Sequence, residues 1–572
     1  MENRQKELTG YPSIDRPWLK VYSEEAINAS QPTGSIYDFL LAVNKDYPHN
    51  IAIHYQNKNI TYGELFRKID CCARAFMALG VQRNDIVTVA MPNTPEMVYT
   101  LYALNRLGAI ANFIHPLASK DEICNYLNEV KSRFFLMFTG TYLLVGDALK
   151  ETSVEKAIVV SPVQSLSPLF KWLYRLKTNE KIIEDDRIIS WNSFIQHGQN
   201  IELPEPQRAD NDVAVITHTG GTTGDPKGVM CTNLNYNSHG RQMLADRGSK
   251  RQDCTMVHLP PFINYSLSAA LASFSSGFRV LLIPRYDPKK MAWYIRRFKV
   301  NYILSIPAYF EVLLKSHKIA KDAFNTLGCI VTAGESMSVE MEREVNNVLR
   351  AHGSPVNLTK GIGMTELVSG ATLTFPWYDA DGSSGIPYVK TNCKIVEVGT
   401  DDELTYDEIG EICFSGPSVM LGYYGNQAAT DEMIHVDADG TRWLHTGDLG
   451  YMTRDGIIYV SGRLKRLIMI KDKDGLISKI FPERIEQVIE THPAVALSCI
   501  VGVPDKQCIA WPKAFVVLNE NIEANQEVKT AILAHCSQHL PPYMVPHNIV
   551  FIDEMPRTNR GKIDYKQLEQ AQ

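Results

Sequence analysis

The sequence lacks the features that define several common protein classes. Its eleven cysteines are scattered and form no CxxC pair, which argues against a disulfide framework or a zinc ribbon. No uninterrupted apolar run reaches the roughly 20 residues that cross a membrane, and the polar N-terminus has no apolar signal-peptide core. Lys and Arg number 58 against 64 Asp and Glu, and a net charge of −6 without a basic tract disfavours nucleic-acid binding. We expect a cytoplasmic protein with reduced thiols.

What the sequence does contain is alternation of helix and strand patterns over most of its length. With 572 residues, 45% of them hydrophobic, the chain is long enough for two or more domains. The region 62–79 has helical spacing and ends at Gly80, and Thr94 with Pro95 marks a helix start after the strand pattern 85–91. Such repetition predicts an α/β fold with mainly parallel sheets.

The pattern of predicted helices and strands changes twice toward the C-terminal end of the sequence. After Gly382, short strands and turns (CKIVEV, GEICFSG, IIYVSG) predict a small antiparallel β unit. From Leu464 a new unit begins, with a helix over 482–491 and strands CIVGV and AFVVL. We therefore predict one domain over 1–463, with a β-rich subdomain over about 383–463, and a second domain over 464–572.

The segment Ser165 to Lys177, SLSPLFKWLYRLK, mixes apolar, aromatic and basic residues irregularly. One interpretation is a peripheral contact with a membrane surface. The other is a surface insertion that folds against the body of the protein.

The strongest local signal is THTGGTTGDPKG, which follows the predicted strand 213–217. Glycines let the backbone approach an anion, threonine hydroxyls donate hydrogen bonds, and a lysine adds positive charge, so the loop suits a polyphosphate. It is not a Walker A loop, because Pro226 precedes the lysine and Gly228 follows it. The candidate phosphate-binding residues are Thr219, Gly220, Gly221, Thr222, Thr223, Gly224 and Lys227.

This loop resembles the phosphate-binding loop of the adenylate-forming superfamily, which includes acyl-CoA synthetases, peptide-synthetase adenylation domains and luciferases. The segments RPWLKVY, ITYGEL, VAMPNTPE, LGAI and HPL are similar to the long-chain acyl-CoA synthetase branch. GMTE (363–366), GD (447–448), GRLK (462–465) and PRTNRGK (556–562) follow in the family's order. The resemblance implies a large domain of α/β subdomains with a β-barrel-like subdomain, and a small mobile α+β C-terminal domain.

The resemblance also assigns nucleotide contacts. The loop would hold the ATP phosphates, Glu366 with Thr219 would hold Mg²⁺, and Asp448 in a turn would accept hydrogen bonds from the ribose hydroxyls. Thr365 and Glu366, both expected to be catalytic, would end a loop rather than lie inside a helix, and Arg463 would contact ribose or phosphate. The segments expected at adenine are Ala333, Gly334 and Glu335, and Gly361, Ile362, Gly363 and Met364.

Lys562 is the residue that the resemblance places at the chemistry. It would bridge the carboxylate substrate and the α-phosphate, where the transition state gains negative charge. Lys465 would be the hinge at which the small domain rotates, first to insert Lys562 for adenylation and then to admit a thiol. The implied reaction forms acyl-AMP and pyrophosphate from a carboxylic acid and ATP, then transfers the acyl group to coenzyme A.

Three departures from the family pattern bear on specificity. Ile362 replaces the usual aromatic residue over adenine, and Ile263 stands at the usual histidine of the segment that gates the acyl pocket. The stretch 471–479 is longer than expected, and its Gly475 is the expected close-approach residue for the pantetheine arm.

The acid and the acyl acceptor remain open at this stage. Apolar residues at the expected acyl pocket, including Phe262 and Tyr265, fit a fatty acid but would also fit a helix core. The alternative enzyme is a free-standing adenylation enzyme that loads an acyl or amino acid onto a separate carrier protein. No DxxxS-type segment precedes Tyr265 to pair with an amino group, which disfavours an amino acid. A non-catalytic nucleotide-binding or lipid-binding protein is disfavoured because the charged motif residues are all present.

Overall fold

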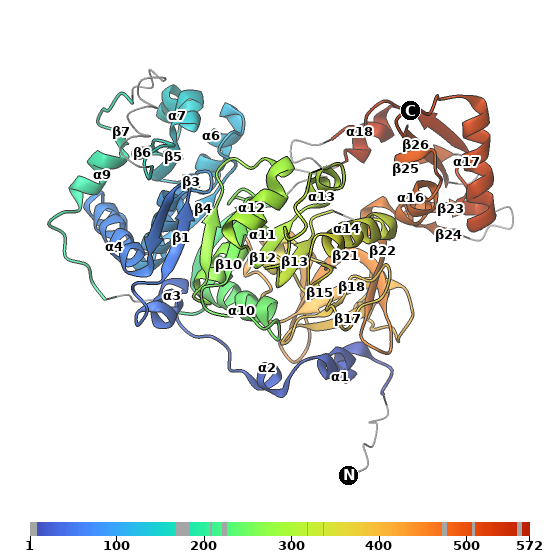
Figure 1. Ribbon diagram of the computed structural model, residues 1–572, viewed down its shortest axis with the longest axis horizontal. Coiled ribbons are helices and arrows are strands. Elements are labelled where there is room, and N and C mark those ends of the chain that lie inside the picture. Colours follow the sequence, from blue (N-terminus) through green and yellow to red (C-terminus); the bar gives the residue numbers. More distant parts are fainter. Residues whose placement is uncertain are drawn as a thin grey trace, which may run out of the picture.

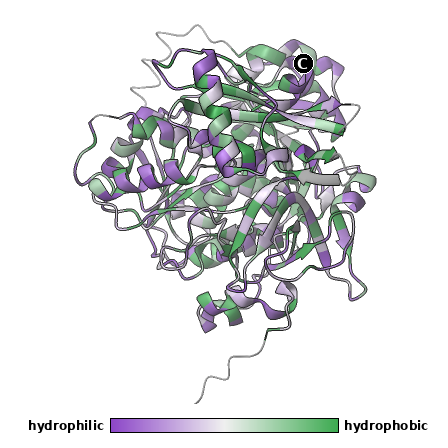
Figure 2. Ribbon diagram, turned by 90° about the vertical axis from the view of Figure 1, so that its right-hand side faces the viewer, coloured by the Kyte–Doolittle hydropathy of each residue, from purple (hydrophilic) through white to green (hydrophobic). Residues whose placement is uncertain are grey.

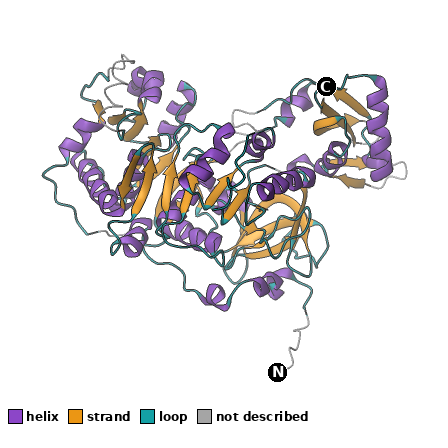
Figure 3. Ribbon diagram, viewed as in Figure 1, coloured by secondary structure: helices purple, strands orange, loops and turns teal. Residues whose placement is uncertain are grey.

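The computed structural model describes residues 8–166, 182–205, 209–219, 226–316, 318–335, 337–471, 477–505, 509–557 and 563–571. Two large, mainly parallel sheets with helices around them lie side by side, a smaller antiparallel unit adjoins them, and the C-terminal elements gather at one end (Figure 1). This arrangement confirms the predicted α/β class with a β-rich unit and a smaller C-terminal unit. Figure 3 shows how the helices surround the strands.

The first large sheet has eight strands in the order β19-β9-β8-β4-β3-β5-β6-β7. The six strands from β8 to β7 are parallel, and β9 and β19 join antiparallel. Their cores are apolar and buried, as expected for a sheet covered on both faces. The bounds are β3 Ile86–Ala90, β4 Ile110–Phe113, β5 Phe134–Phe138, β6 Lys156–Val160, β7 Ile188–Ser190, β8 Val213–His218, β9 Gly228–Thr232 and β19 Gly422–Tyr423.

Two helices beside this sheet, α4 and α5, begin where the sequence patterns predicted. Helix α4 (Tyr62–Ala78) starts with a capping box between Thr61 and Glu64, and Thr94 caps α5 (Pro95–Leu107). Gly108 closes α5 in the left-handed conformation that glycine adopts readily. The neighbouring helices are α3 Ile36–Asn44, α6 Lys120–Glu129, α7 Thr139–Val145 and α9 Trp191–His197.

The second large sheet has seven strands in the order β14-β13-β12-β10-β11-β1-β2, all parallel except β2. Its strands are β1 Ile51–Tyr55, β2 Lys58–Thr61, β10 Cys254–Val257, β11 Arg279–Leu282, β12 Tyr302–Ser305, β13 Cys329–Thr332 and β14 Leu358–Lys360. Its helices are α10 Asn233–Leu244, α11 Asn264–Phe274, α12 Met291–Phe298, α13 Pro307–Leu314 and α14 Val339–Ala351.

The antiparallel unit follows, as the sequence predicted after Gly382. Its strands are β17 Asn392–Val396, β18 Gly410–Ser415, β20 Ile434–Val436, β21 Arg442–Met452 and β22 Ile458–Arg463, with α15 Gln427–Met433. Strand β21 is the centre of the unit because it pairs with β18, β20 and β22. Figure 2 shows apolar residues concentrated in the interior strands and helices.

The C-terminal residues form their own sheets and apolar clusters. A hairpin of β23 (Ile468–Lys471) and β24 (Ile477–Ile480) accompanies a sheet of β25 (Val495–Asp505), β26 (Ile509–Leu518) and β27 (Asn548–Phe551). The helices are α16 Pro482–Glu490, α17 Gln526–His539 and α18 Tyr565–Gln570. Among the described residues, no helix is both long enough and apolar enough to span a membrane.

Replacing Phe76 by Ala tests the packing between α4 and α9. Phe76 is fully buried, and its ring centroid lies 4.8 Å from that of Phe194. We expect Phe76→Ala to lower the free energy of unfolding by about 3–5 kcal/mol, because a cavity replaces the ring. Leu143→Ala is the matched control, since Leu143 is 67% exposed. Denaturant melts followed by circular dichroism measure both, and an equal effect of the two substitutions would contradict the described packing.

Candidate functional site

The predicted phosphate loop joins two paired strands of the first sheet. Strands β8 and β9 are antiparallel, and His218 lies opposite Gly228 at the point where the loop leaves them. The Thr219 backbone N–H donates to the Lys227 carbonyl at 3.0 Å, and the Lys227 N–H donates to Thr219 Oγ1 at 3.1 Å. These two bonds close the base of the loop. Residues Gly220, Gly221, Thr222, Thr223 and Gly224 lie outside the described residues.

A chain of contacts leads from this loop to the GMTE motif. The Lys227 ammonium lies 4.8 Å from the centre of the Tyr423 ring, and the Tyr423 hydroxyl donates to Glu366 Oε1 at 2.6 Å. Burial, and next the charge of Glu366, raise the pKa of Tyr423 well above its usual value, so the hydroxyl remains a donor. Lys227 and Glu366, predicted separately, therefore meet at one tyrosine.

Glu366 is buried in a single 3-10 turn, Thr365–Leu367, that ends the GMTE loop. Asn264 donates to the Thr365 carbonyl at 3.3 Å, and the Met420 N–H donates to the Glu366 carbonyl at 2.9 Å. Val368 follows with φ of 63°, a conformation that costs energy for a β-branched residue. Asn264 and Met420 thus fix the backbone of this turn, and the Tyr423 hydroxyl fixes the orientation of the Glu366 carboxylate.

The two expected adenine segments leave the same edge of the second sheet. Thr332 and Lys360 are register partners at the carboxyl ends of β13 and β14, and the segments that begin at Ala333 and Gly361 follow them. A ligand-binding crevice is expected at this edge of a parallel sheet. Gly334 has φ of +93°, and the Ala333 N–H donates to the Ser305 carbonyl at 3.2 Å.

Only glycine fits at two positions of the second segment. A Cβ on Gly361 would lie 2.0 Å from the Thr372 carbonyl oxygen, and one on Gly363 would lie 1.9 Å from that of Ser369. Between them, Ile362 is buried and its N–H donates to Thr372 Oγ1 at 2.7 Å. The segment therefore lies flat against the backbone that follows it, with Met364 half-buried at its end.

Asp448 and Arg463 are brought together by strand pairing. They are register partners in β21 and β22, and Arg463 Nε lies 2.6 Å from Asp448 Oδ1. The expectation that Asp448 lies in a turn is wrong, because β21 continues through it from Arg442 to Met452. Gly447 takes φ of +68°, and the pairing register shifts nearby, so the strand is irregular without ending.

The two aromatic residues expected at the acyl pocket lie at the N-terminal end of α11. Phe262 is half-buried, with its ring centroid 4.5 Å from that of His115, which follows β4. The Tyr265 hydroxyl donates to the Val331 carbonyl of β13 at 3.5 Å. Both residues therefore lie near carboxyl ends of parallel strands, and Ile263 between them is 38% exposed.

Lys465 is exposed in a 3-10 turn, Leu464–Arg466, between β22 and β23. The adjacent Arg466 is directed into the C-terminal elements, with Nη1 3.0 Å from Glu483 Oε1 and Nη2 2.5 Å from Glu486 Oε1. It also donates to the Ile500 carbonyl at 3.1 Å. Two further predicted residues, Gly475 and Lys562, lie outside the described residues, as does most of the segment 165–177.

Sequence reasoning missed two residues of this region. Tyr423 was not singled out, although the sequence LGYYG places aromatic residues after a glycine within the predicted β-rich subdomain. His258 directly follows β10 and lies five residues before Ile263, and its Nε2 is 3.1 Å from Ser305 Oγ. Burial lowers the pKa of His258 to about 3, so it is neutral beside the rings of Tyr286 and Tyr309. Its position at a parallel strand end was the available signal.

These contacts define what the site can do chemically. Lys227 supplies positive charge at the base of a Gly/Thr loop, and Glu366 supplies a carboxylate fixed by Tyr423. A carboxylate has about four acceptor positions, so the Tyr423 bond leaves capacity for a cation. Glu366 therefore fits a hard cation that also contacts phosphate oxygens.

Comparison with known proteins identifies the family of this arrangement. The family model described as AMP-binding enzyme matches residues 41–424, and the model of the AMP-binding enzyme C-terminal domain matches 484–562. A long-chain-fatty-acid–CoA ligase of Bacillus subtilis (strain 168) is 28% identical over 561 residues, which cover 96% of each chain. A long-chain-fatty-acid–CoA ligase of Yersinia pestis is 28% identical over 582 residues, covering 97% of this chain and 98% of its own.

Solved structures share the fold. The o-succinylbenzoate coenzyme A synthetase from Bacillus subtilis, in complex with ATP and magnesium ion, has a TM-score of 0.74 and 26% identity. The match covers 94% of this chain and all of that chain.

Substituting Gly363 by Ala tests the close packing of the GMTE segment. The added Cβ would lie 1.9 Å from a backbone oxygen, so the segment must move by about an ångström. We expect ATP-dependent turnover to fall roughly 10²-fold, the effect of such a misplacement at an active site. Gly328→Ala is the control, because its Cβ would meet only ordinary contacts. Unchanged turnover in Gly363→Ala would contradict the described backbone path.

Proposed function

Because the chain belongs to the family of AMP-binding enzymes, we propose that it is an acid–thiol ligase that makes acyl-AMP from a carboxylic acid and ATP. Pyrophosphate leaves, and the acyl group then passes to coenzyme A. The observation that carries this proposal is the contact chain from Lys227 through Tyr423 to Glu366. It joins a lysine of the phosphate loop to a cation-binding carboxylate at one site.

Two nucleophilic displacements account for the reaction, of which the first forms acyl-AMP and the second consumes it. A carboxylate oxygen attacks the α-phosphorus of ATP, the bond to the β-phosphate oxygen breaks, and acyl-AMP and pyrophosphate form. The thiolate sulfur of coenzyme A then attacks the acyl carbonyl carbon, and AMP leaves with the electrons of the acyl–oxygen bond. The thiol proton is lost to solvent. Both steps need positive charge near phosphate oxygens.

The described residues fit the handling of the polyphosphate. Lys227 and the loop closed by Thr219 would hold the β- and γ-phosphates, and Glu366 with Thr219 would hold Mg²⁺. When bound, Mg²⁺ would neutralise charge on the phosphate oxygens. Tyr423 would orient Glu366 throughout, since its raised pKa keeps the hydroxyl protonated.

The nucleoside would lie between the second sheet and the β-rich unit. The segments 333–335 and 361–364 would flank adenine, with Ile362 providing an aliphatic surface in place of a stacking ring. Asp448 would accept hydrogen bonds from the ribose hydroxyls, and Arg463, 2.6 Å from it, would contact ribose or phosphate.

The C-terminal residues would complete the site. We place a domain boundary between Arg463 and Leu464, with Lys465 as the hinge and 464–572 as the mobile domain. Lys562 would approach the α-phosphate for adenylation and withdraw for thioester formation, when Gly475 would lie along the pantetheine arm. The support is the order of the sequence motifs together with the match of a C-terminal family model over 484–562.

The acid is proposed to be a fatty acid. Two relatives that match over nearly their whole length are named as long-chain-fatty-acid–CoA ligases, although others that match as fully are named as probable 4-coumarate–CoA ligases. Phe262 and Tyr265 line the strand ends where the acyl chain would lie. A carrier protein is the alternative acceptor, and the adenylation step would be the same for both.

A panel of carboxylic acids tests the function. We expect fatty acids to give pyrophosphate and AMP from ATP, and coenzyme A to convert the adenylate to a thioester detectable by mass spectrometry. Release of ADP would contradict the proposal. Pyrophosphate release without a thioester would keep the adenylation and replace coenzyme A as acceptor.

Lys562→Ala separates the two half-reactions. We expect adenylate formation to fall roughly 10²–10³-fold, the usual cost of removing one transition-state charge contact. Thioester formation from supplied acyl-adenylate should be unchanged, because the lysine is withdrawn in that step. Lys566→Ala is a control from the same end of the chain. Equal loss of both half-reactions would overturn the role of Lys562.

A further inference from the structure

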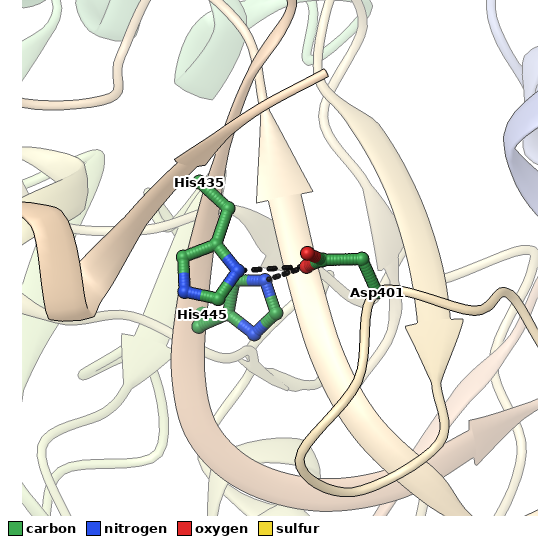
Figure 4. A group of neighbouring side chains, drawn as sticks. All are labelled: Asp401, His435 and His445. Carbon is green, nitrogen blue, oxygen red and sulfur yellow. Dashed lines mark hydrogen bonds and ion pairs between the residues drawn. The ribbon is translucent and has the colours of Figure 1, made fainter. Parts of the chain in front are cut away.

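A cluster of two histidines and an aspartate lies in the β-rich unit, outside the residues assigned to ATP. Asp401 comes from the loop between β17 and β18, His435 from β20 and His445 from β21 (Figure 4). His435 Nδ1 lies 2.7 Å from Asp401 Oδ1, and His445 Nε2 lies 3.1 Å from the same oxygen. The two imidazole centroids are 4.0 Å apart. Three potential ligand atoms therefore face one point.

The hydrogen bonds of Glu411 determine which nitrogen of His445 carries the hydrogen and which one is the acceptor that faces Asp401. The Gly447 N–H donates to Glu411 Oε1 at 2.8 Å, and His445 Nδ1 lies 3.0 Å from Glu411 Oε2. A carboxylate that accepts from Gly447 also accepts from His445, so Nδ1 carries the hydrogen. In neutral His445, Nε2 then presents a lone pair to the Asp401 oxygen.

Burial makes this lone pair significant. His445 is 6% exposed, and its Nε2 is buried without a hydrogen-bond partner. Two facing lone pairs repel unless a proton or a cation lies between them. The Glu411–His445 pair also has the form of the carboxylate–histidine pairs that orient histidine ligands of metal ions.

The dimensions suit a small transition-metal ion. Bonds of about 2.0–2.1 Å to nitrogen and oxygen in a tetrahedral site place ligand atoms about 3.3 Å apart. The distances of 2.7 and 3.1 Å are about 0.6 and 0.2 Å shorter than this spacing, a difference that a small rotation of the exposed Asp401 side chain would supply. Asp401 is 55% exposed and His435 37%, so an ion can enter from solvent and keep water as a further ligand. The nearby Lys394 ammonium is engaged by Asp437 at 3.5 Å.

We propose that Asp401, His435 and His445 bind one Zn²⁺-class divalent transition-metal ion, with Glu411 as the hydrogen-bond partner that orients His445. The neighbouring group of Glu411, Cys413 and His445 is the less suitable site, because all three residues are buried and give an ion no entry from solvent. Two imidazole nitrogens and one carboxylate favour Zn²⁺ over Mg²⁺ or Ca²⁺, which take oxygen ligands.

The ion would act on the strand that carries Asp448. His445 lies three residues before Asp448 on β21, and Glu411 contacts both His445 and Gly447. A bound ion would hold β21 to β20 and to the 401 loop, and so would stabilise the irregular strand around Gly447. This is a structural role, and it does not depend on the proposed function.

Zinc binding to the full-length protein tests the proposal. After removal of metal with a chelator, titration with Zn²⁺ against a chromophoric competitor measures stoichiometry and affinity. We expect one tight site in the wild type, and affinity at least tenfold weaker in His435→Ala and in Asp401→Asn. Both substitutions are at exposed or half-exposed residues, so folding is preserved and is checked by melting temperature. Zn²⁺ should raise the melting temperature of the wild type and not of His435→Ala.

Two control variants remove histidines that lie outside the proposed site. His197→Ala removes an exposed histidine on α9 and should leave the tight site intact. His535 and His539 lie one turn apart on α17 with ring centroids 4.5 Å apart, so the double substitution by Ala tests the other histidine pair. Equal zinc affinity in wild type and His435→Ala, or loss of the tight site only in the α17 variant, would overturn the proposal.

Discussion

The hydrogen bond from the Tyr423 hydroxyl to the Glu366 carboxylate is the interaction on which the arrangement of the site depends. Glu366 is buried, and a buried carboxylate is costly unless it is hydrogen-bonded or paired with a cation. Tyr423 supplies that bond because β19 pairs with β9, directly after the phosphate loop. The same ring contacts Lys227. The two-residue strand β19 therefore connects the phosphate loop to the Glu366 carboxylate.

The two large sheets supply the rest of the site through a common geometric rule. In parallel sheets the carboxyl ends of all strands lie at one edge, and loops there are close to one another without any direct pairing. His115, His258, Ala333 and Gly361 follow β4, β10, β13 and β14 in this way. The fold therefore collects residues that are more than 200 positions apart in sequence, while the antiparallel β21 and β22 add Asp448 and Arg463 from the other unit.

Local signals predicted much of this structure from the sequence. The start of β8 at Val213 and the start of α5 after Thr94 agree with the patterns, because caps and short β-branched runs are determined by neighbouring residues. The family motifs identified Lys227, Glu366, Asp448 and Arg463. Asp448 was misplaced in a turn because glycine before aspartate is typical of turns, whereas pairing with β18 and β22 keeps the strand intact. Tyr423 and the histidines at Asp401 depend on long-range pairing, which single-sequence patterns do not contain.

Two arginines bracket the junction between the β-rich unit and the C-terminal elements. Arg463 is held to Asp448 by an ion pair and by strand pairing, whereas Arg466 is held to Glu483, Glu486 and the Ile500 carbonyl. If the C-terminal domain rotates as proposed and the contacts of both arginines persist, the backbone dihedral angles of Leu464 and Lys465 must change. Because only these two residues lie between the contacts, the rotation proposed for the C-terminal domain would be limited to a few orientations, and a substitution at either residue would change which ones are accessible.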